Sequence, residues 1–179
     1  MSRLLIGSLV GGLLIFLWQF MSWSMLNVHK AEFKYTENQE AIITALNENL
    51  SEDGGYFIPM PAPDASKEEM EAVHTDAQGK PWAHINYHAS YDVNMPMNMI
   101  RGYLVDVVAV FLLCWILMHF KELDMKTTVL SAMAVGVIGY LVISYTNAVW
   151  FEVNTIGHLI DNIVQWGLCG VWLGWWLNR

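Results

Sequence analysis

The sequence is short of charged residues and nearly lacks cysteine. Only 15% of its 179 residues are charged, whereas a soluble domain has roughly 25%. Its two cysteines, Cys114 and Cys169, lie in apolar stretches, which excludes the disulfide framework of a small secreted domain. The chain has nine basic and 17 acidic residues, and its net charge of −8 argues against a nucleic-acid partner.

Sequence patterns of common enzyme classes are also missing. The chain has no Gly-rich phosphate loop, no nucleophile elbow and no His-Glu-x-x-His helix. It has no pair of cysteines spaced for structural zinc. These absences favour a protein that is not an enzyme, and they leave the identity of any cofactor open.

Long apolar stretches account for most of the chain. Four of them, at residues 4–26, 102–120, 128–146 and 156–177, are poor in charge. About 20 apolar residues rising ~1.5 Å each cross the ~30 Å hydrocarbon layer. The first stretch exceeds the roughly 7–15 apolar residues of a signal peptide, so we interpret it as a membrane anchor. The sequence therefore predicts an all-α membrane protein with a four-helix transmembrane bundle.

The stretch between the first two predicted helices has a different composition. Residues 1–26 form the first anchor, residues 27–100 a polar segment, and residues 101–179 the other three helices. Within the polar segment, Thr36 with Gln39 and Ser66 with Glu69 have the spacing of helix capping boxes. We predict a first helix over residues 36–50, and a second helix that opens at Ser66 and runs to about residue 76.

A strand is predicted later in the same segment, over residues 82–90, where aromatic and polar residues alternate. We expect it to pair with the extended stretch at residues 56–60. Residues 27–100 are therefore interpreted as a small α+β extracytoplasmic domain inserted between the first and second transmembrane helices.

Basic residues near the ends of the helices predict the orientation. Arg3, Lys121, Lys126 and Arg179 fall on one side of a four-helix bundle, whereas residues 27–100 hold four lysines and twelve acids. Basic residues in short flanks favour the cytoplasmic side. We therefore predict a multi-pass protein of the cell inner membrane, with both termini cytoplasmic and residues 27–100 periplasmic.

The last predicted helix carries an unusual polar stripe. His158, Asp161, Asn162 and Gln165 follow the i, i+3, i+4, i+7 pattern of one helix face. Charged groups in a membrane avoid lipid, so this face should meet the other helices, which carry polar groups at a similar depth. The predicted cluster contains Gln19, Ser22, Arg101, Asp106, Ser144, Asn147, His158, Asp161 and Gln165. It is either a hydrogen-bonded network that fixes helix register, a ligand or proton-handling site, or a contact with a partner subunit.

Two small-xxx-small patterns lie in the predicted cytoplasmic halves of the first and last helices. They are Gly7 with Gly11, and Gly170 with Gly174. Small residues let helix backbones approach closely in lipid. We expect these two helices to pack together there, although one pattern could instead make a homodimer.

A methionine-rich stretch precedes the second predicted helix. Met95, Met97 and Met99 would share one face of an extended segment, as would His84 and His88 on the predicted strand. Thioethers and imidazoles suit soft ions such as Cu(I). The stretch resembles the methionine-rich and histidine-rich segments of periplasmic copper-handling proteins, which implies a copper site. The alternative is that these methionines are apolar contacts at the membrane surface.

Three functional hypotheses follow from the sequence. The first is a non-enzymatic accessory or scaffold subunit of a larger inner-membrane complex, whose partners are the lipid bilayer and other membrane-protein subunits or further copies of itself. The second is a membrane protein that binds a small ligand or a metal at the polar cluster. The third is periplasmic copper handling.

Overall fold

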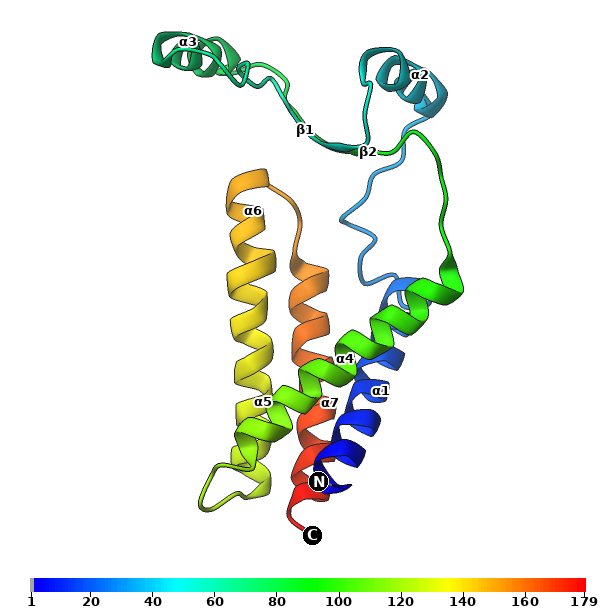
Figure 1. The fold of residues 1–179 in the computed structure, drawn as a ribbon, viewed down its shortest axis with the longest axis vertical. Helices are drawn as coiled ribbons and strands as arrows, with labels where there is room; N and C mark the ends of the chain where they lie inside the picture. The colour runs from blue at the N-terminus through cyan, green and yellow to red at the C-terminus, as the bar shows by residue number, and fades with distance from the viewer. Residues whose placement is uncertain (1) are drawn as a thin grey trace. The chain divides into compact units, whose positions relative to one another are not determined.

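The computed structural model describes residues 2–179, which form two compact units. One unit contains the chain up to Lys34 together with Asn94–Arg179, and the other is Tyr35–Val93. The first unit is helical (Figure 1). Its elements are α1 (Ser2–Ser24), α4 (Met95–Leu117), α5 (Met125–Gly139), the π-helix η1 (Tyr140–Tyr145), α6 (Thr146–Phe151) and α7 (Ile156–Leu177). The predicted helical protein with a small α+β insert between its first two long helices is confirmed.

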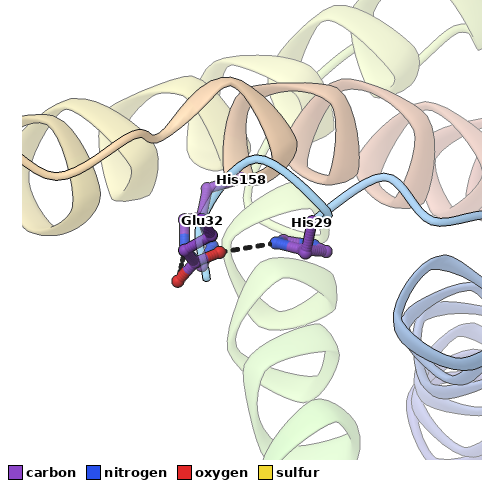
Figure 2. Close-up of side chains that lie close together, drawn as sticks. All are labelled: His29, Glu32 and His158. Atoms are coloured by element: carbon purple, nitrogen blue, oxygen red, sulfur yellow. Dashed lines mark hydrogen bonds and ion pairs between the residues drawn. The ribbon is translucent and has the colours of Figure 1, made fainter. Parts of the chain in front are cut away.

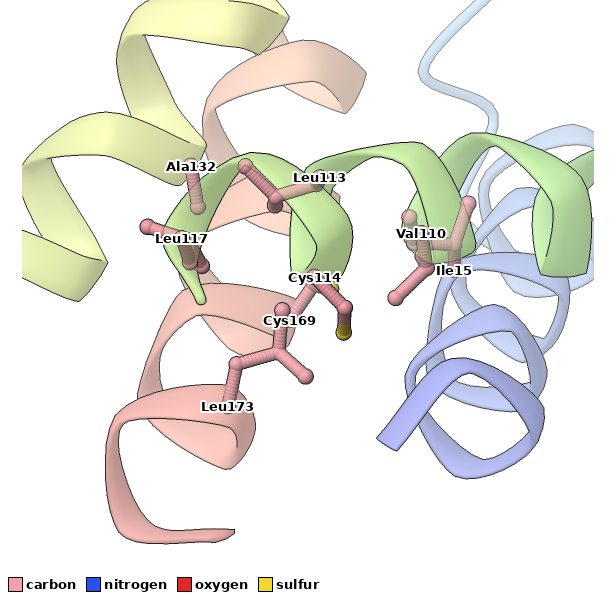
Figure 3. Close-up of a cluster of buried hydrophobic side chains, with 8 residues drawn as sticks. All are labelled: Ile15, Val110, Leu113, Cys114, Leu117, Ala132, Cys169 and Leu173. Carbon is pink, nitrogen blue, oxygen red and sulfur yellow. The ribbon is translucent and has the colours of Figure 1, made fainter. Parts of the chain in front are cut away.

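Packing in the helical unit centres on α1 and α7. Helix α1 packs against α4 and α7, and α7 also packs against α5. The two ends of the chain lie at the same end of this unit (Figure 1). A buried apolar core joins the helices (Figure 3). It consists of Ile15, Val110, Leu113, Cys114, Leu117, Ala132, Cys169 and Leu173.

Three helices are long and apolar enough to cross a membrane. They are Ser2–Ser24, Met95–Leu117 and the continuous stretch Met125–Phe151, and they indicate a multi-pass membrane protein. The sequence had predicted four such helices. Although α7 has 22 residues, it is not among the three by composition, because its first half carries the polar stripe His158, Asp161, Asn162 and Gln165.

The third membrane helix is interrupted by a π-helical turn. Residues 125–151 run through α5, η1 and α6, so this helix is longer than the predicted 128–146. Asp124 caps its start by accepting a hydrogen bond from the backbone N–H of Thr127 at 2.7 Å. The π turn begins at the buried Tyr140, whose hydroxyl lies 3.1 Å from the Thr155 hydroxyl just before α7. This contact ties the π turn to the start of α7.

The methionine-rich stretch is helical, so the predicted extended segment is wrong. Helix α4 begins at Met95, because the Asn94 side chain accepts a hydrogen bond from the backbone N–H of Met97 at 3.1 Å and Pro96 occupies the first turn. In a helix, residues four positions apart share a face, whereas residues two positions apart do not. Met95 and Met99 therefore lie on one face and Met97 points away from it, so the three thioethers do not share one face as the extended segment required.

The glycine patterns differ in their neighbours. Gly7 and Gly11 on α1 lie close to side chains of both α4 and α7, including Cys114 and Cys169. Gly170 and Gly174 instead face α5, where a Cβ on Gly170 would lie 3.0 Å from the Cα of Val129. The expected packing of the first and last helices is therefore confirmed at Gly7 and Gly11, although Gly170 and Gly174 contact α5. At the neighbouring Gly12, a Cβ would lie 2.8 Å from backbone atoms of Val107 on α4.

The unit of residues 35–93 contains two helices and a two-stranded sheet. Strand β1 (Gly54–Ile58) pairs with β2 (Ala83–Tyr87) in antiparallel register, with Tyr56 opposite Ile85. The predicted pairing is confirmed, although β2 is shorter than the predicted 82–90. Among residues 35–93, Tyr87 is the only buried hydrophobic side chain, and its hydroxyl donates to the Asn47 side chain at 2.8 Å.

The two helices of the unit of residues 35–93 are those for which capping boxes were predicted. Helix α3 (Lys67–Ala77) starts with the predicted reciprocal bonds between Ser66 and Glu69. The predicted box at Thr36 is wrong, because α2 (Gln39–Asn49) begins at Gln39 and Asn38 occupies the capping position. The Thr36 hydroxyl instead accepts a bond from the backbone N–H of Asn38 at 3.3 Å.

Candidate metal centre

The chain leaves α1 through a turn that brings His29 and Glu32 onto α7. Asn27 takes a left-handed backbone conformation with φ of 52°, which reverses the chain after the helix. The backbone N–H of Glu32 then bonds to the carbonyl of His29 at 3.0 Å. His29 and Glu32 are thereby presented on one side of the turn, three residues apart.

A glycine in the first turn of α7 makes room for this turn. A Cβ on Gly157 would lie 2.8 Å from Nδ1 of His29 and 3.1 Å from the carbonyl of Val28. Contacts below 3.0 Å require something to shift, so a larger residue at position 157 would displace the loop. Gly157 thus lets His29 lie directly against α7.

His29, Glu32 and His158 offer three ligand atoms to one point. Glu32 Oε2 lies 2.9 Å from His29 Nδ1, and Glu32 Oε1 lies 3.3 Å from His158 Nε2. Figure 2 shows the Glu32 carboxylate between the two imidazoles. The ligand atoms all lie within 4.8 Å of one another. Zinc bonds of about 2.0–2.1 Å in a tetrahedron place neighbouring ligand atoms about 3.3 Å apart, so the spacing fits a metal ion after small side-chain adjustments.

Asp161 holds the other side of the His29 ring. Its Oδ2 lies 2.8 Å from His29 Nε2, whereas its Oδ1 accepts hydrogen bonds from Trp18 Nε1 at 3.0 Å and Ser22 Oγ at 2.5 Å. Trp23 stacks on His29 with ring centroids 3.7 Å apart and an interplanar angle of 8°. The imidazole of His29 is thereby buried and fixed in orientation.

Both ring nitrogens of His29 face a carboxylate oxygen. Nε2 lies 2.8 Å from Asp161 Oδ2, and Nδ1 lies 2.9 Å from Glu32 Oε2. A neutral imidazole carries one proton, so one of these two contacts joins two acceptors. Two facing acceptors need a cation between them, which is either a metal ion or a second proton. A carboxylate on the far nitrogen of a metal-binding histidine is a common outer-shell contact.

The predicted polar cluster is divided among several contacts. His158 belongs to the metal-ligand group and Asp161 supports it, while Gln19 Nε2 donates to Asp106 Oδ1 at 3.2 Å. Gln165 lines a cavity of about 390 Å³ between α1, α4 and α7 together with Gln19 and Asp161. Two buried atoms, Asp106 Oδ2 and Gln165 Oε1, have no hydrogen-bond partner among residues 2–179.

The remaining residues of the predicted polar cluster are not in the metal-ligand group. Asn147 lines a cavity of about 430 Å³ together with Ser144, Thr155, Glu32 and His158. Arg101 is exposed on α4, and within residues 2–179 no ion pair joins it to Asp106 or Asp161.

His84 and His88 belong to the other unit. His84 lies in β2 opposite Phe57, and His88 follows that strand with its Nδ1 3.3 Å from Asp53 Oδ2. The backbone N–H of Ala89 and the nearby His88 hold the pKa of Asp53 below its usual range. Within residues 2–179, neither histidine belongs to a group of three His, Cys, Asp or Glu side chains close enough to hold a metal ion.

Two residues of the group were missed from the sequence. They are His29 and Glu32, which belong to no recognised sequence motif. The available signal was their spacing of three residues directly after the first apolar stretch, at the depth where His158 begins the last one.

Comparison with known proteins gave no match. No family model matches the chain, no curated protein is similar to it in sequence, and no solved structure matches it. The functional argument therefore rests on the chemistry of the residues described above.

Proposed function

We propose that this chain is a multi-pass membrane protein that binds a divalent transition metal, with Zn²⁺ as the preferred ion, through His29, Glu32 and His158. The observation that carries the proposal is the convergence of ligand atoms of His29, Glu32 and His158 within 4.8 Å of one another, with the far nitrogen of His29 held 2.8 Å from Asp161 Oδ2. Two imidazoles and one carboxylate are ligands that zinc takes in sites with an open fourth position.

The open position would face a cavity. The cavity of about 430 Å³ is lined by Glu32 and His158 and by polar side chains of Ser144, Asn147 and Thr155. A metal there can polarise a water or a small oxygen-containing ligand that enters this cavity. The binding of a small molecule at the metal is thus part of the proposed function.

Metal analysis of the purified protein tests the proposal. The protein would be purified in mild detergent without chelators, dialysed against trace zinc, and analysed for zinc content. We expect about one zinc per chain in the wild type, as three convergent ligands imply. The Glu32→Gln and His158→Ala variants should lose it. Matched controls are His119→Ala and His88→Ala, which remove imidazoles outside the group and should retain zinc.

Cobalt substitution gives a second readout. Tetrahedral Co²⁺ absorbs visible light, and the band should be present in the wild type and absent in Glu32→Gln, which keeps the size of the side chain. A wild type without zinc or the cobalt band, or equal values in wild type and Glu32→Gln, would overturn the proposed site. The group would then be a hydrogen-bond network that holds no metal.

We also propose that α7 crosses the membrane as a fourth span. At one end, Asp161 accepts a hydrogen bond from Ser22 near the end of α1, and at the other end Trp176 Nε1 donates to the carbonyl of Arg3 at 2.8 Å. Helix α7 therefore runs alongside α1 over almost its whole length. If α1 spans the bilayer, α7 lies at the same depth.

The proposed location is the cell inner membrane, with both termini cytoplasmic and the unit of residues 35–93 periplasmic. The supporting observation is the basic residues at Arg3, Lys121, Lys126 and Arg179 against the acidic insert. Green fluorescent protein fused after residue 152 or after Arg179 tests it, because it fluoresces only on the cytoplasmic side. We expect fluorescence only from the fusion at Arg179. The same result at both positions would show that α7 does not cross.

An accessory role in a larger complex remains a second candidate. The observation that favours it is the unit of residues 35–93, which has Tyr87 as its only buried hydrophobic side chain. A unit with so little core gains stability by resting on another surface. Native mass spectrometry at native expression level should then find a stoichiometric partner chain or a second copy, and a lone chain would count against this role.

A further inference from the structure

Two cavities in the helical unit share the lining residue Asn162. The first, of about 390 Å³, lies between α1, α4 and α7. Its lining is mostly apolar but includes the polar side chains of Gln19 and Gln165. The second, of about 380 Å³, lies between α4, α5, η1 and α7, and its lining is also mostly apolar. Both cavities suit apolar groups, and the first also offers polar contacts.

The first cavity contains an acceptor without a donor. Gln165 is 8% exposed, and its Oε1 has no hydrogen-bond partner in the described part of the chain. A buried polar atom without a partner is destabilising. The neighbouring amide of Gln19 does not satisfy it, because its Nε2 donates to Asp106 instead. The missing contact is a hydrogen-bond donor, an O–H or an N–H.

We propose that these cavities bind a membrane-soluble amphiphile, whose head group donates a hydrogen bond to Gln165 Oε1 and whose apolar tail occupies the second cavity. The first cavity is lined by Phe16, Phe20 and Trp23 of a membrane-spanning helix, so its occupant comes from the bilayer. The proposed contact at Gln165 does not use a metal ligand, although His158 and Asp161 also line the first cavity.

The donating head group can come from two sources, a neutral hydroxyl or an ammonium. Native mass spectrometry in mild detergent would measure the occupancy of three probes: 2-decylhydroquinone, its dimethyl ether, and dioctanoyl phosphatidylethanolamine. The hydroquinone and the ether share a shape, but only the hydroquinone donates hydrogen bonds. We expect one of the two donors to bind about tenfold more tightly than the ether, and the preferred donor identifies the source.

Two variants locate the ligand within the cavities. Gln165→Leu removes the acceptor, and we expect it to lower affinity for the preferred donor about tenfold while leaving the ether unchanged. Gly139→Leu fills the second cavity, where a Cβ meets nothing within 4 Å, and should weaken all three probes. Gly167→Leu is the matched control, because its Cβ also meets nothing within 4 Å and it lines neither cavity.

The outcomes separate this inference from the proposed function. Equal affinity of wild type and Gln165→Leu for every probe, or binding weakened as much by Gly167→Leu as by Gly139→Leu, would overturn the amphiphile site. The zinc content of the same samples is read independently. Gln165→Leu should keep its zinc, whereas Glu32→Gln should lose zinc and still bind the amphiphile.

Discussion

Replacing Gly12 by alanine should force α1 and α4 apart. A Cβ at this position would lie 2.8 Å from both the Cα and the backbone nitrogen of Val107. Carbon atoms in contact normally lie about 3.5–4.0 Å apart, so the helices must separate by roughly 1 Å. Overpacking of this kind costs about 1–3 kcal/mol, because backbone atoms cannot rotate out of the way.

Alanine also forms helix more readily than glycine, by up to about 1 kcal/mol, so a control is needed. Gly167→Ala supplies it, because a Cβ at Gly167 meets nothing within 4 Å. Unfolding of both variants in mixed micelles by titration with sodium dodecyl sulfate, followed by circular dichroism, gives the two free energies. We expect Gly12→Ala to be about 1–3 kcal/mol less stable than the control. Equal stability of the two variants would refute the close approach of α1 to α4.

Three further results are expected. Asp161→Asn should weaken zinc binding about 10–100-fold in a chelator competition assay, because it disturbs the hydrogen bond that orients His29, and unchanged affinity would contradict this role. Gly157→Ala should also weaken zinc binding, since its Cβ displaces His29, and normal affinity would show that the loop accommodates it. The backbone N–H of Ser66 lowers the pKa of Glu69, so the capping box should persist above the ordinary carboxyl range and open as pH falls through the lowered pKa. The Ser66 amide resonance should report this opening, and a resonance that does not respond to that titration would argue against the bond.

The sequence predicted the elements that depend on local patterns. The polar stripe of α7 was visible because residues 158, 161, 162 and 165 repeat with the helix period, and its contact with other helices followed from the cost of exposing Asp161 to lipid. The Ser66 capping box was predictable because it depends on a short-range rule. The two strands were predicted at residues 56–60 and 82–90 from local composition, and they lie at residues 54–58 and 83–87.

The metal-ligand group could not be predicted in the same way. Glu32 reaches His158 only because the left-handed Asn27 turns the chain back and Gly157 leaves space for it. Neither feature has a periodic signal. Gly12 was likewise missed in favour of Gly11, because the crossing of α1 and α4 decides which of two adjacent glycines meets a backbone. The methionine stretch was misread because the Asn94 cap was not recognised.

The polarity of α7 has a consequence for how the protein is made. An aspartate at the centre of an isolated helix raises the free energy of membrane insertion by about 2.5–3.5 kcal/mol, and one nearer the end, such as Asp161, raises it by less. The donors that offset this cost, Trp18 and Ser22, belong to α1, which is made before α7. If α7 crosses the membrane, α1 must therefore be beside it when it inserts. Replacing both Trp18 and Ser22 by residues without a donor should lower the efficiency with which α7 inserts.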